Sequence, residues 1–300
     1  MARSKSRRTP PSPRSAPASS GRQGTALPAA ARKGAGRRQG LLLYGSHAVR
    51  AALANPHRRC HRLLLTQEAE QREGTALATL AARRSRPPQI ERIDRADLEL
   101  SLPDAVHQGI ALEAAPLDPP SLQEFLAALP QGPALLVVLD QVTDPHNVGA
   151  ILRSAAVFGA GAVIAPERKA APESGTLGKA ASGALEIVPY LREVNLARTL
   201  EQLKEAGFWV LGLAGESPQL LASYDPPERI ALCLGAEGRG LRRLTRERCD
   251  LLLSLPAAGD FRDLNVSNAA AVGLYALSQK QLAQGREDTS SRASAPQDRR

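Results

Sequence analysis

Between residues 134 and 282 the sequence alternates between short apolar runs and segments of helical periodicity, and this alternation restricts the fold more than any other feature. Ala134–Asp140 (ALLVVLD) is an uninterrupted apolar run of strand length, as expected for a strand buried on both faces. Further strands are expected at 162–165, 185–188, 208–213, 230–234 and 251–255, and helices at 147–158, 196–206, 241–246 and 266–282. This order predicts an α/β fold with a largely parallel sheet and helices on both faces.

A smaller α/β unit is expected before this region. Its predicted elements are a helix at 46–54 capped by Ser46, a strand at 61–66, a helix at 67–84, a strand at 89–93, a short helix and a strand at 109–114. Three prolines within 115–120 oppose a helix and indicate a linker. The predicted organisation is a basic tail at 1–40, a first domain at 41–115, a linker at 116–121, a second domain at 122–283 and a disordered tail at 284–300.

Composition excludes several classes of protein. A chain of 300 residues with 43% hydrophobic residues is typical of two soluble domains. No apolar run approaches the roughly 18 residues that a membrane-spanning helix requires, so no membrane association is expected. Cys60, Cys233 and Cys249 are odd in number and form no CxxC pair, which argues against a disulfide framework or a zinc site and fits the cytoplasm.

The net charge of +9 comes from the N-terminal segment of the chain. Residues 1–40 contain ten Lys or Arg and no acid, whereas the remaining chain holds 29 basic and 30 acidic residues. A Pro-, Ser- and Gly-rich segment of this kind is expected to be disordered, and a disordered polycation suits an RNA phosphate backbone. A mitochondrial transit peptide is the alternative. Because Pro10, Pro11, Pro13, Pro17 and Pro28 oppose an amphipathic helix, we favour an RNA-binding arm on a bacterial cytoplasmic protein.

Ligands of open parallel sheets bind beyond the carboxyl ends of the strands, so the loops that follow predicted strands hold the candidate functional residues. In the first such loop, Asn147 lies at a predicted helix start, where its side chain would cap free amides. Arg153 has no acid three or four residues away, and a structural Arg here would extend over apolar surface. Asp140, Asp144 and His146 are of metal-ligand types, but turn and capping roles are commoner beside a proline, and we expect no metal.

Two later loops are also unusual. Residues 235–240 (GAEGRG) follow a predicted strand, and the spacing G-x-x-G-x-G matches neither the dinucleotide fingerprint nor the Walker motif. The loop lets a ligand approach the backbone and holds one carboxylate, Glu237. Residues 255–268 precede a helix rich in Ala and Gly, with Asn265 and Ser267 as natural caps. Taken singly, each of the three loops has a structural explanation.

In order and spacing the three loops resemble the signature motifs of the SpoU/TrmH family of RNA ribose 2′-O-methyltransferases, in the SPOUT superfamily. The matching stretches are 147–155 (NVGAILRSA), 235–240 (GAEGRG) and 255–269 (LPAAGDFRDLNVSNA). The resemblance covers residues 41–283. It is closest to the RlmB-type subgroup, which methylates a guanosine of 23S rRNA, through residues 44–49, 107–110 and 179–186.

The resemblance implies a fold, a cofactor and an assembly. The expected fold is a parallel sheet with a trefoil knot, preceded by an RNA-binding domain of L30e type, and the expected assembly is a homodimer formed through the catalytic domain. The implied cofactor is S-adenosylmethionine, held largely by backbone groups. Carried over by motif, the cofactor-binding residues are Gly235, Leu255, Leu264, Leu213 and Ala214.

The implied reaction is an SN2 methyl transfer to a ribose oxygen, so the protein must orient that oxygen and help remove its proton. The family gives the central role to Arg153, in some accounts as a base. Because a guanidinium is a poor proton acceptor, we expect Arg153 to hold the adjacent phosphate and stabilise the developing alkoxide. Asn147 and Glu237 are expected to position Arg153 and the ribose, and Asn265 and Ser267 to shape the site.

One residue departs from the family pattern. Asp263 stands where the family usually has Ser, and a carboxylate beside an RNA phosphate is unfavourable unless Arg262 or Arg153 neutralises it. An RNA-binding homologue that has lost catalysis is therefore one alternative to the enzyme, and a tRNA 2′-O-methyltransferase is another. The additional domain at 41–115 favours rRNA, because a minimal tRNA enzyme of the family has no need of it.

Overall fold

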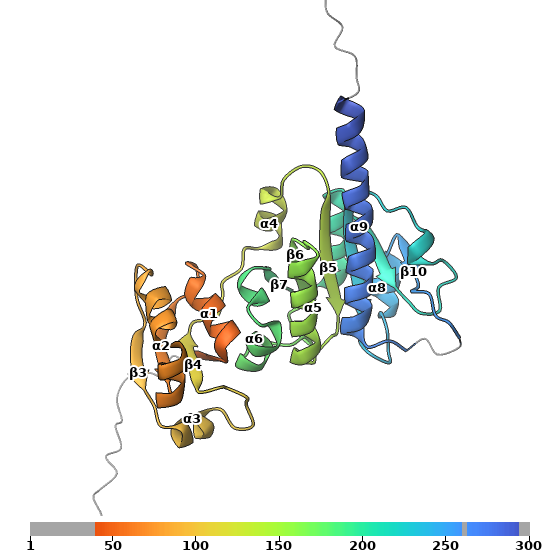
Figure 1. The fold of residues 1–300 in the computed structure, drawn as a ribbon. Coiled ribbons are helices and arrows are strands. Elements are labelled where there is room, and N and C mark those ends of the chain that lie inside the picture. Colours follow the sequence, from red (N-terminus) through yellow and green to blue (C-terminus); the bar gives the residue numbers. More distant parts are fainter. Residues whose placement is uncertain (1–39, 260–262, 294–300) are drawn as a thin grey trace, which may run out of the picture. The chain divides into compact units, whose positions relative to one another are not determined.

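The structure, a computed structural model, describes residues 40–259 and 263–293, which form two β-sheets with their helices (Figure 1). The predicted basic tail lies outside the described residues except for Gly40, as do Arg262 and residues 294–300. Among the described residues, no helix combines the length and apolar character needed to cross a bilayer.

The first sheet has four strands in the order β1-β4-β2-β3, with β4 antiparallel to both of its neighbours and β2 parallel to β3. Its elements are β1 (Leu41–Tyr44), α1 (Ser46–Ala54), β2 (Cys60–Leu65), α2 (Gln67–Ala82), β3 (Gln89–Arg92), α3 (Arg95–Ser101) and β4 (Ile110–Ala114). Val49, Leu63, Leu77 and Leu112 are fully buried between the sheet and its helices. Leu63 and Leu65 of β2 both point into this core. Because alternate residues of a strand face opposite sides of the sheet, these two residues fix which face of β2 is turned toward the helices.

The second sheet has six parallel strands in the order β10-β8-β9-β5-β6-β7. Its strands are β5 (Ala134–Asp140), β6 (Ala162–Pro166), β7 (Tyr190–Glu193), β8 (Trp209–Leu213), β9 (Arg229–Gly235) and β10 (Leu251–Leu253). Its helices are α4 (Leu122–Ala128), α5 (Pro145–Val157), α6 (Gly175–Ala181), α7 (Leu196–Glu205), α8 (Arg243–Arg248) and α9 (Val266–Ala293), with short 3₁₀ turns η1 (Ala184–Glu186) and η2 (Leu221–Ser223). The predicted parallel α/β sheet is confirmed.

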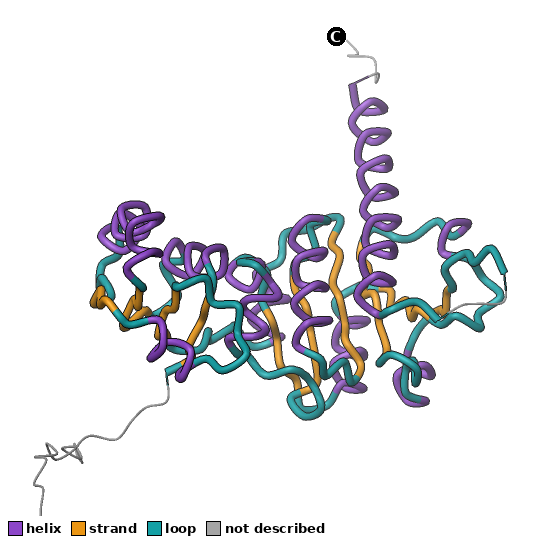
Figure 2. The backbone as a smooth tube through the Cα atoms, turned by 60° about the horizontal axis from the view of Figure 1, so that its bottom comes forward, coloured by secondary structure: helices purple, strands orange, loops and turns teal. Residues whose placement is uncertain are grey.

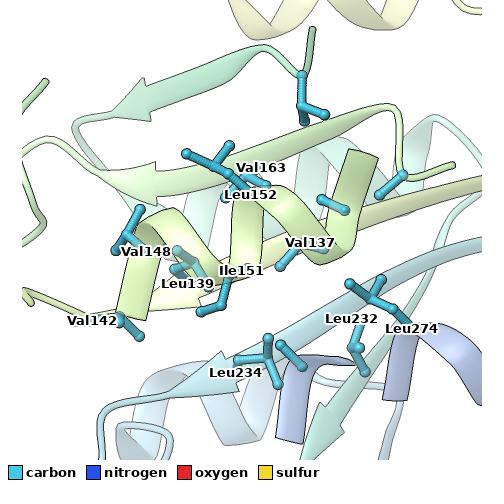
Figure 3. Close-up of a cluster of buried hydrophobic side chains, with 14 of the residues drawn as sticks. Val137, Leu139, Val142, Val148, Ile151, Leu152, Val163, Leu232, Leu234 and Leu274 are labelled. Carbon is cyan, nitrogen blue, oxygen red and sulfur yellow. The ribbon is translucent and has the colours of Figure 1, made fainter. Parts of the chain in front are cut away.

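Alternate residues of β5 show how the helices cover both faces of this sheet. Val137 and Leu139 pack in the cluster formed with α5 and α9, whereas Leu136 and Val138 pack in the cluster formed with α4 and α7. Figure 3 shows Val137 and Leu139 facing Val148, Ile151 and Leu152 of α5. The tube in Figure 2 shows strands side by side with helices on both sides of them. Burial on both faces explains why the strand sequences are almost wholly apolar.

Two local predictions are wrong. Residues 185–188 do not form a strand: η1 occupies Ala184–Glu186, and the strand begins only after Pro189. The chain is still completing a turn there, because Ser182 and Gly183 have φ of 52° and 99°. Leu185 and Val188 are nevertheless buried, and this burial produced the apolar signal. Ser46 does not cap α1 either: Gly45 occupies that position, and the Ser46 hydroxyl donates to Glu73.

Besides β7 and the two 3₁₀ turns, three elements were not predicted: β1, α4 and α6. A signal for α4 existed, because Ser121 and Glu124 form a capping box of the S-x-x-E type. The last helix also continues further than expected. α9 runs to Ala293, past the end of the sheet (Figure 1), whereas its predicted end is 282 and the predicted disordered tail starts at 284. After Gly285 no Gly or Pro interrupts the sequence before Pro296.

Candidate active site

A cavity of about 690 Å³ lies at the carboxyl ends of β8, β9 and β10. Its walls come from Arg246 of α8 and from four segments that are far apart in the sequence: 213–216, 234–241, 255–257 and 263–269. Loops beyond the carboxyl ends of parallel strands are where ligands of such sheets bind, and the volume falls in the roughly 300–1,000 Å³ range of small-molecule sites.

All five residues that the sequence motifs designated for the cofactor line this cavity: Leu213, Ala214, Gly235, Leu255 and Leu264. Ala214 is almost completely buried, whereas Leu264 is 45% exposed. Four of these residues have apolar side chains, and Gly235 has no side chain. They therefore offer a ligand apolar surface and backbone amide groups.

The glycine-rich loop needs Gly235 for a steric reason. A Cβ atom at this position would lie 2.0 Å from the carbonyl carbon of Gly240 and 2.2 Å from the nitrogen of Leu241. The loop folds back at this point, with the Gly240 amide donating to the carbonyl of Ala236 at 2.8 Å. Gly238 and Gly240 have φ of 72° and 63°, in the left-handed region that favours glycine.

Asp140 fixes the far end of the same loop. Its carboxylate is fully buried at the end of β5 and accepts the backbone amide of Arg242 at 2.9 Å and the Nε of Arg242 at 2.6 Å. The sequence predicts only a turn role for Asp140, so this role was missed. The signal was present, because an acid that ends a fully buried strand must have a partner. Among the described residues, no cluster of His, Cys, Asp and Glu is arranged to hold a metal ion.

Four of the five predicted catalytic residues come together beside the cavity. The amide nitrogen of Asn265 donates to Asn147 Oδ1 at 3.0 Å and, at 3.4 Å, to Glu237 Oε2. The Oδ1 atom of Asn265 accepts the backbone amide of Ser267 at 2.9 Å and its hydroxyl at 2.6 Å, and so caps α9. One side chain therefore connects α5, the glycine-rich loop and the start of α9.

Asn147 itself is not a helix cap, contrary to the prediction. Asp144 caps α5 by accepting the amides of His146 and Asn147 at 3.1 and 3.3 Å. Because Asp144 satisfies these amides, the Asn147 side chain is available to Asn265. Pro145 at the first helical position, with its fixed φ, favours the same start.

Arg153 is not brought to this cluster within a single chain. It lies six residues after Asn147 on α5, which places it about 9 Å further along the helix axis. Its side chain is exposed, and no described residue forms an ion pair with it or hydrogen-bonds to it. Val157, one turn further along α5, is 76% exposed. The two residues share an open helix face.

Both signs of charge line the cavity. Glu216, Glu237 and Asp263 contribute carboxylates, and Arg239 and Arg246 contribute guanidinium groups. Glu216 and Arg246 form an ion pair. Hydrogen bonds from its own backbone amide and from Arg246 lower the pKa of Glu216 below its usual value. Neither member of this pair was predicted, because neither lies in a recognised motif.

The parallel sheet is covered on both faces, and a glycine-rich loop and a polar cluster lie beside a cavity at its carboxyl edge. This arrangement is that of an α/β enzyme with a small-molecule site. Residues 134–275 match the SpoU rRNA Methylase family, and residues 42–120 match the family described as RNA 2'-O ribose methyltransferase substrate binding. The chain belongs to the SpoU rRNA methylase family.

The matches to named relatives cover most of the chain. It is 40% identical over 243 residues to the 23S rRNA (guanosine-2'-O-)-methyltransferase RlmB of Pseudomonas putida, covering 80% of this chain and 97% of the relative. The RlmB of Escherichia coli K12 is 40% identical over 237 residues, covering 78% and 96%. The crystal structure of the SpoU methyltransferase AviRb from Streptomyces viridochromogenes shares the fold, with a TM-score of 0.68 and 23% identity over 83% of this chain and 92% of that one.

Proposed function

We propose that this protein transfers a methyl group from S-adenosylmethionine to a ribose 2′-hydroxyl in RNA, at a guanosine of 23S rRNA. The relatives that carry this activity in their names match nearly their whole length at about the same identity. The observation that carries the proposal is the hydrogen-bonded group of Asn147, Asn265 and Glu237, which lies beside the cavity lined by the glycine-rich loop.

The cavity suits S-adenosylmethionine on two grounds. Leu213, Leu255 and Leu264 provide apolar surface of the kind that an adenine ring contacts. The absence of a Cβ at Gly235 lets the glycine-rich loop fold back on itself, and this loop lines the cavity. Glu216, Glu237 and Asp263 place carboxylates around the lining, which suits the positive sulfonium and ammonium groups of this molecule. When bound, S-adenosylmethionine supplies the methyl group on an electrophilic sulfonium.

The chain's own residues orient the acceptor and manage its charge. Asn147 and Glu237, held by Asn265, present an amide and a carboxylate to the ribose. Ser267 is held at the start of α9 by Asn265, which accepts both its backbone amide and its hydroxyl, and so it shapes the site beside the ribose. The Arg153 guanidinium holds the phosphate next to the target and stabilises the developing alkoxide, while the proton of the 2′-hydroxyl leaves in a concerted step or to water.

Asp263 lines the cavity and is exposed, so water moderates the cost of its charge. Its place in the lining suits the cationic side of the cofactor better than a phosphate. An inactive homologue is therefore the less favoured interpretation, since Asn147, Asn265 and Glu237 remain in mutual contact.

A second copy of the chain would bring Arg153 to an active site. Val157 is 76% exposed on α5, and Val272 and Tyr275 are 46% and 55% exposed on α9, which packs against α5. These apolar side chains support a homodimer formed through the α5 and α9 face. In such a dimer Arg153 extends toward the active site of the partner subunit.

A knotted path of the chain is the second structural part of the proposal. The loop 214–221 holds the segment after β10 at several points. Ala214 donates to the carbonyl of Leu253 at 2.9 Å, Leu221 donates to that of Ser254 at 2.9 Å, and the Ser254 amide donates to Gln219 at 2.8 Å. These hydrogen bonds hold both ends of the loop 214–221 against the segment that follows β10. They support a path in which this segment passes through the loop before α9 begins.

The same proposal includes the RNA substrate, the cellular compartment and the partner of the basic tail. The match of residues 42–120 to an RNA substrate-binding family and the rRNA activity of the relatives favour rRNA over tRNA. The relatives are bacterial, which supports the bacterial cytoplasm over a mitochondrial location. The predicted arm at 1–40 remains a prediction, with RNA phosphates as its partner.

The proposed function is tested by incubating the full chain with S-adenosylmethionine labelled on its methyl group. Separate reactions contain 23S rRNA, precursor particles of the large subunit, and bulk tRNA. Label in the rRNA, mapped by primer extension to a guanosine ribose, is the expected result. Label in tRNA alone makes the protein a tRNA enzyme, and no label in any RNA, with binding retained, makes it an inactive RNA-binding homologue.

Replacing Asn265 by aspartate tests the polar cluster directly. The substituted carboxylate still accepts the amides of Ser267 and Asn268, so the cap on α9 is retained. It no longer donates to Asn147, and it repels Glu237. We expect kcat for methyl transfer to fall about 100-fold while the melting temperature changes little, because the loss affects orientation rather than packing. Asn265→Ala, which also removes the cap, lowers both, and a wild-type rate in Asn265→Asp contradicts the proposed cluster.

A further inference from the structure

Arg58 is the largest fully buried side chain among the described residues. Its guanidinium, which belongs to the four-stranded sheet region, reaches two carboxylates of the six-stranded sheet region. Nη2 lies 2.5 Å from Glu186 Oε1, and Nη1 lies 2.5 Å from Glu173 Oε1. Nη1 also donates to the carbonyl of Ala115 at 2.9 Å. Burial acts to lower the pKa of Arg58, but the hydrogen bonds and charges of Glu186 and then Glu173 raise it overall. The charge is buried and paired.

The groups around Arg58 are themselves fixed. Glu186 also accepts Asn55 Nδ2 at 2.8 Å, and Glu173 accepts the backbone amide of Leu117 at 3.0 Å. Arg84 donates to the carbonyls of Leu53 and Asn55, at 2.7 and 2.8 Å, and so holds the end of α1. The end of α1, the linker and the segment between β6 and β7 therefore meet at one ionic junction.

Close packing continues from this junction to the active site. A Cβ at Gly175 of α6 would lie 2.3 Å from the carbonyl oxygen of Leu42 in β1. On the other side of α6, a Cβ at Gly149 of α5 would lie 2.4 Å from the Cβ of Ala180. α6 thus lies between β1 and α5 with backbone close on both sides. Because α5 carries Asn147, the first sheet is packed, through α6, against the helix that holds a residue of the proposed site.

The energetics of the junction indicate a geometric role. An apolar replacement of a buried ion pair is often as stable as the pair itself, so stability alone does not explain three ionised groups here. A planar guanidinium that hydrogen-bonds two carboxylates at once, here called the fork, restricts how its partners are oriented relative to it. The proline-rich linker at 116–121 sets a separation but leaves rotation open. The fork removes that freedom together with the packing of α6 against β1.

On the basis of the proposed function, we propose that Arg58 is a positioning residue that fixes the RNA-docking sheet at a set distance and angle from the methyl-transfer site. The junction then determines specificity, because only an RNA whose docking element and target ribose match that separation reaches the site productively. A short RNA that contacts the methyl-transfer site alone does not depend on it.

The test uses the double variant Arg58→Leu/Glu186→Leu, which removes the fork without leaving Arg58 or Glu186 as an unpaired buried charge. S-adenosylmethionine affinity, measured by calorimetry, is expected to stay within about two-fold of wild type, because the cavity is untouched. For full-length 23S rRNA we expect kcat/KM to fall about 10-fold or more, since misplaced substrates react slowly. For a short hairpin that carries only the mapped target, kcat/KM is expected to stay near wild type.

Two further variants make the result decisive. Arg62 forms a triad of the same composition with Glu113 and Glu91, at 2.6 and 3.3 Å, but entirely within the four-stranded sheet, so Arg62→Leu is expected to leave the ratio of long to short RNA unchanged. Arg58→Lys keeps the charge but loses the fork, and it is expected to lower the ratio even if the double variant does not fold. A wild-type ratio in a folded Arg58→Lys or double variant overturns the proposal. A wild-type chain that methylates no RNA overturns the proposed function instead.

Discussion

Replacing Gly235 by alanine is expected to abolish S-adenosylmethionine binding and methyl transfer together. The added Cβ would lie 2.0 Å from the carbonyl carbon of Gly240 and 2.2 Å from the nitrogen of Leu241, and both are backbone atoms. No side-chain rotation relieves such a contact, so the loop at 236–241 must move. The Asp140 carboxylate opposes that movement through its two hydrogen bonds to Arg242. We expect the affinity to weaken at least about 100-fold, since the cofactor depends on backbone groups of a displaced loop.

Gly259→Ala is the matched control for this substitution. Gly259 lies in the neighbouring loop, a Cβ added there would meet no atom within 4 Å, and its backbone does not require a positive φ. Calorimetric titration with S-adenosylmethionine should give wild-type affinity for Gly259→Ala and no measurable heat for Gly235→Ala. Circular dichroism checks that the sheet survives in both. Wild-type affinity in Gly235→Ala is the result that excludes this loop from the cofactor site.

The sequence predicted the elements whose pattern depends on local burial. β5 and β9 were recognisable because both of their faces are covered, which makes their sequences continuously apolar. The strand expected at 185–188 failed for the same reason: Leu185 and Val188 are buried as turn residues, and burial alone does not distinguish a turn from a strand. α6 escaped notice because its glycines, unfavourable in an isolated helix, are required by contacts with β1.

The candidate site was predictable to the extent that motifs define it. Motif spacing selected Gly235, Leu255 and Leu264, and these residues line one cavity. Their roles as cofactor contacts remain predictions until binding is measured. Asp140, and the pairing of Arg58 with Glu186, were not predictable, because the partner of a buried charge is recognisable only when the distant segment that supplies it is known. Nor does sequence reasoning say which subunit supplies Arg153.

Arg153→Ala is the second substitution for which we expect a very large effect. The side chain is exposed on α5 and has no partner among the described residues, so its loss should leave the folded chain intact. If Arg153 stabilises the developing alkoxide, its removal lowers kcat by about 100- to 1,000-fold, the range seen for loss of one preorganised donor. S-adenosylmethionine affinity should be unchanged, because Arg153 does not belong to the described lining of the cavity.

Mixing two inactive variants then decides whether Arg153 acts within its own subunit or across the dimer. A heterodimer of Arg153→Ala with Gly235→Ala pairs an intact cavity in one subunit with an intact Arg153 in the other. If Arg153 acts across the interface, each heterodimer has one complete site, and random reassembly of an equal mixture restores about a quarter of the wild-type rate. If Arg153 acts within its own subunit, no complete site forms and the mixture stays inactive. Because Arg153 lies about 9 Å along α5 from Asn147 and has no partner among the described residues, we expect recovery.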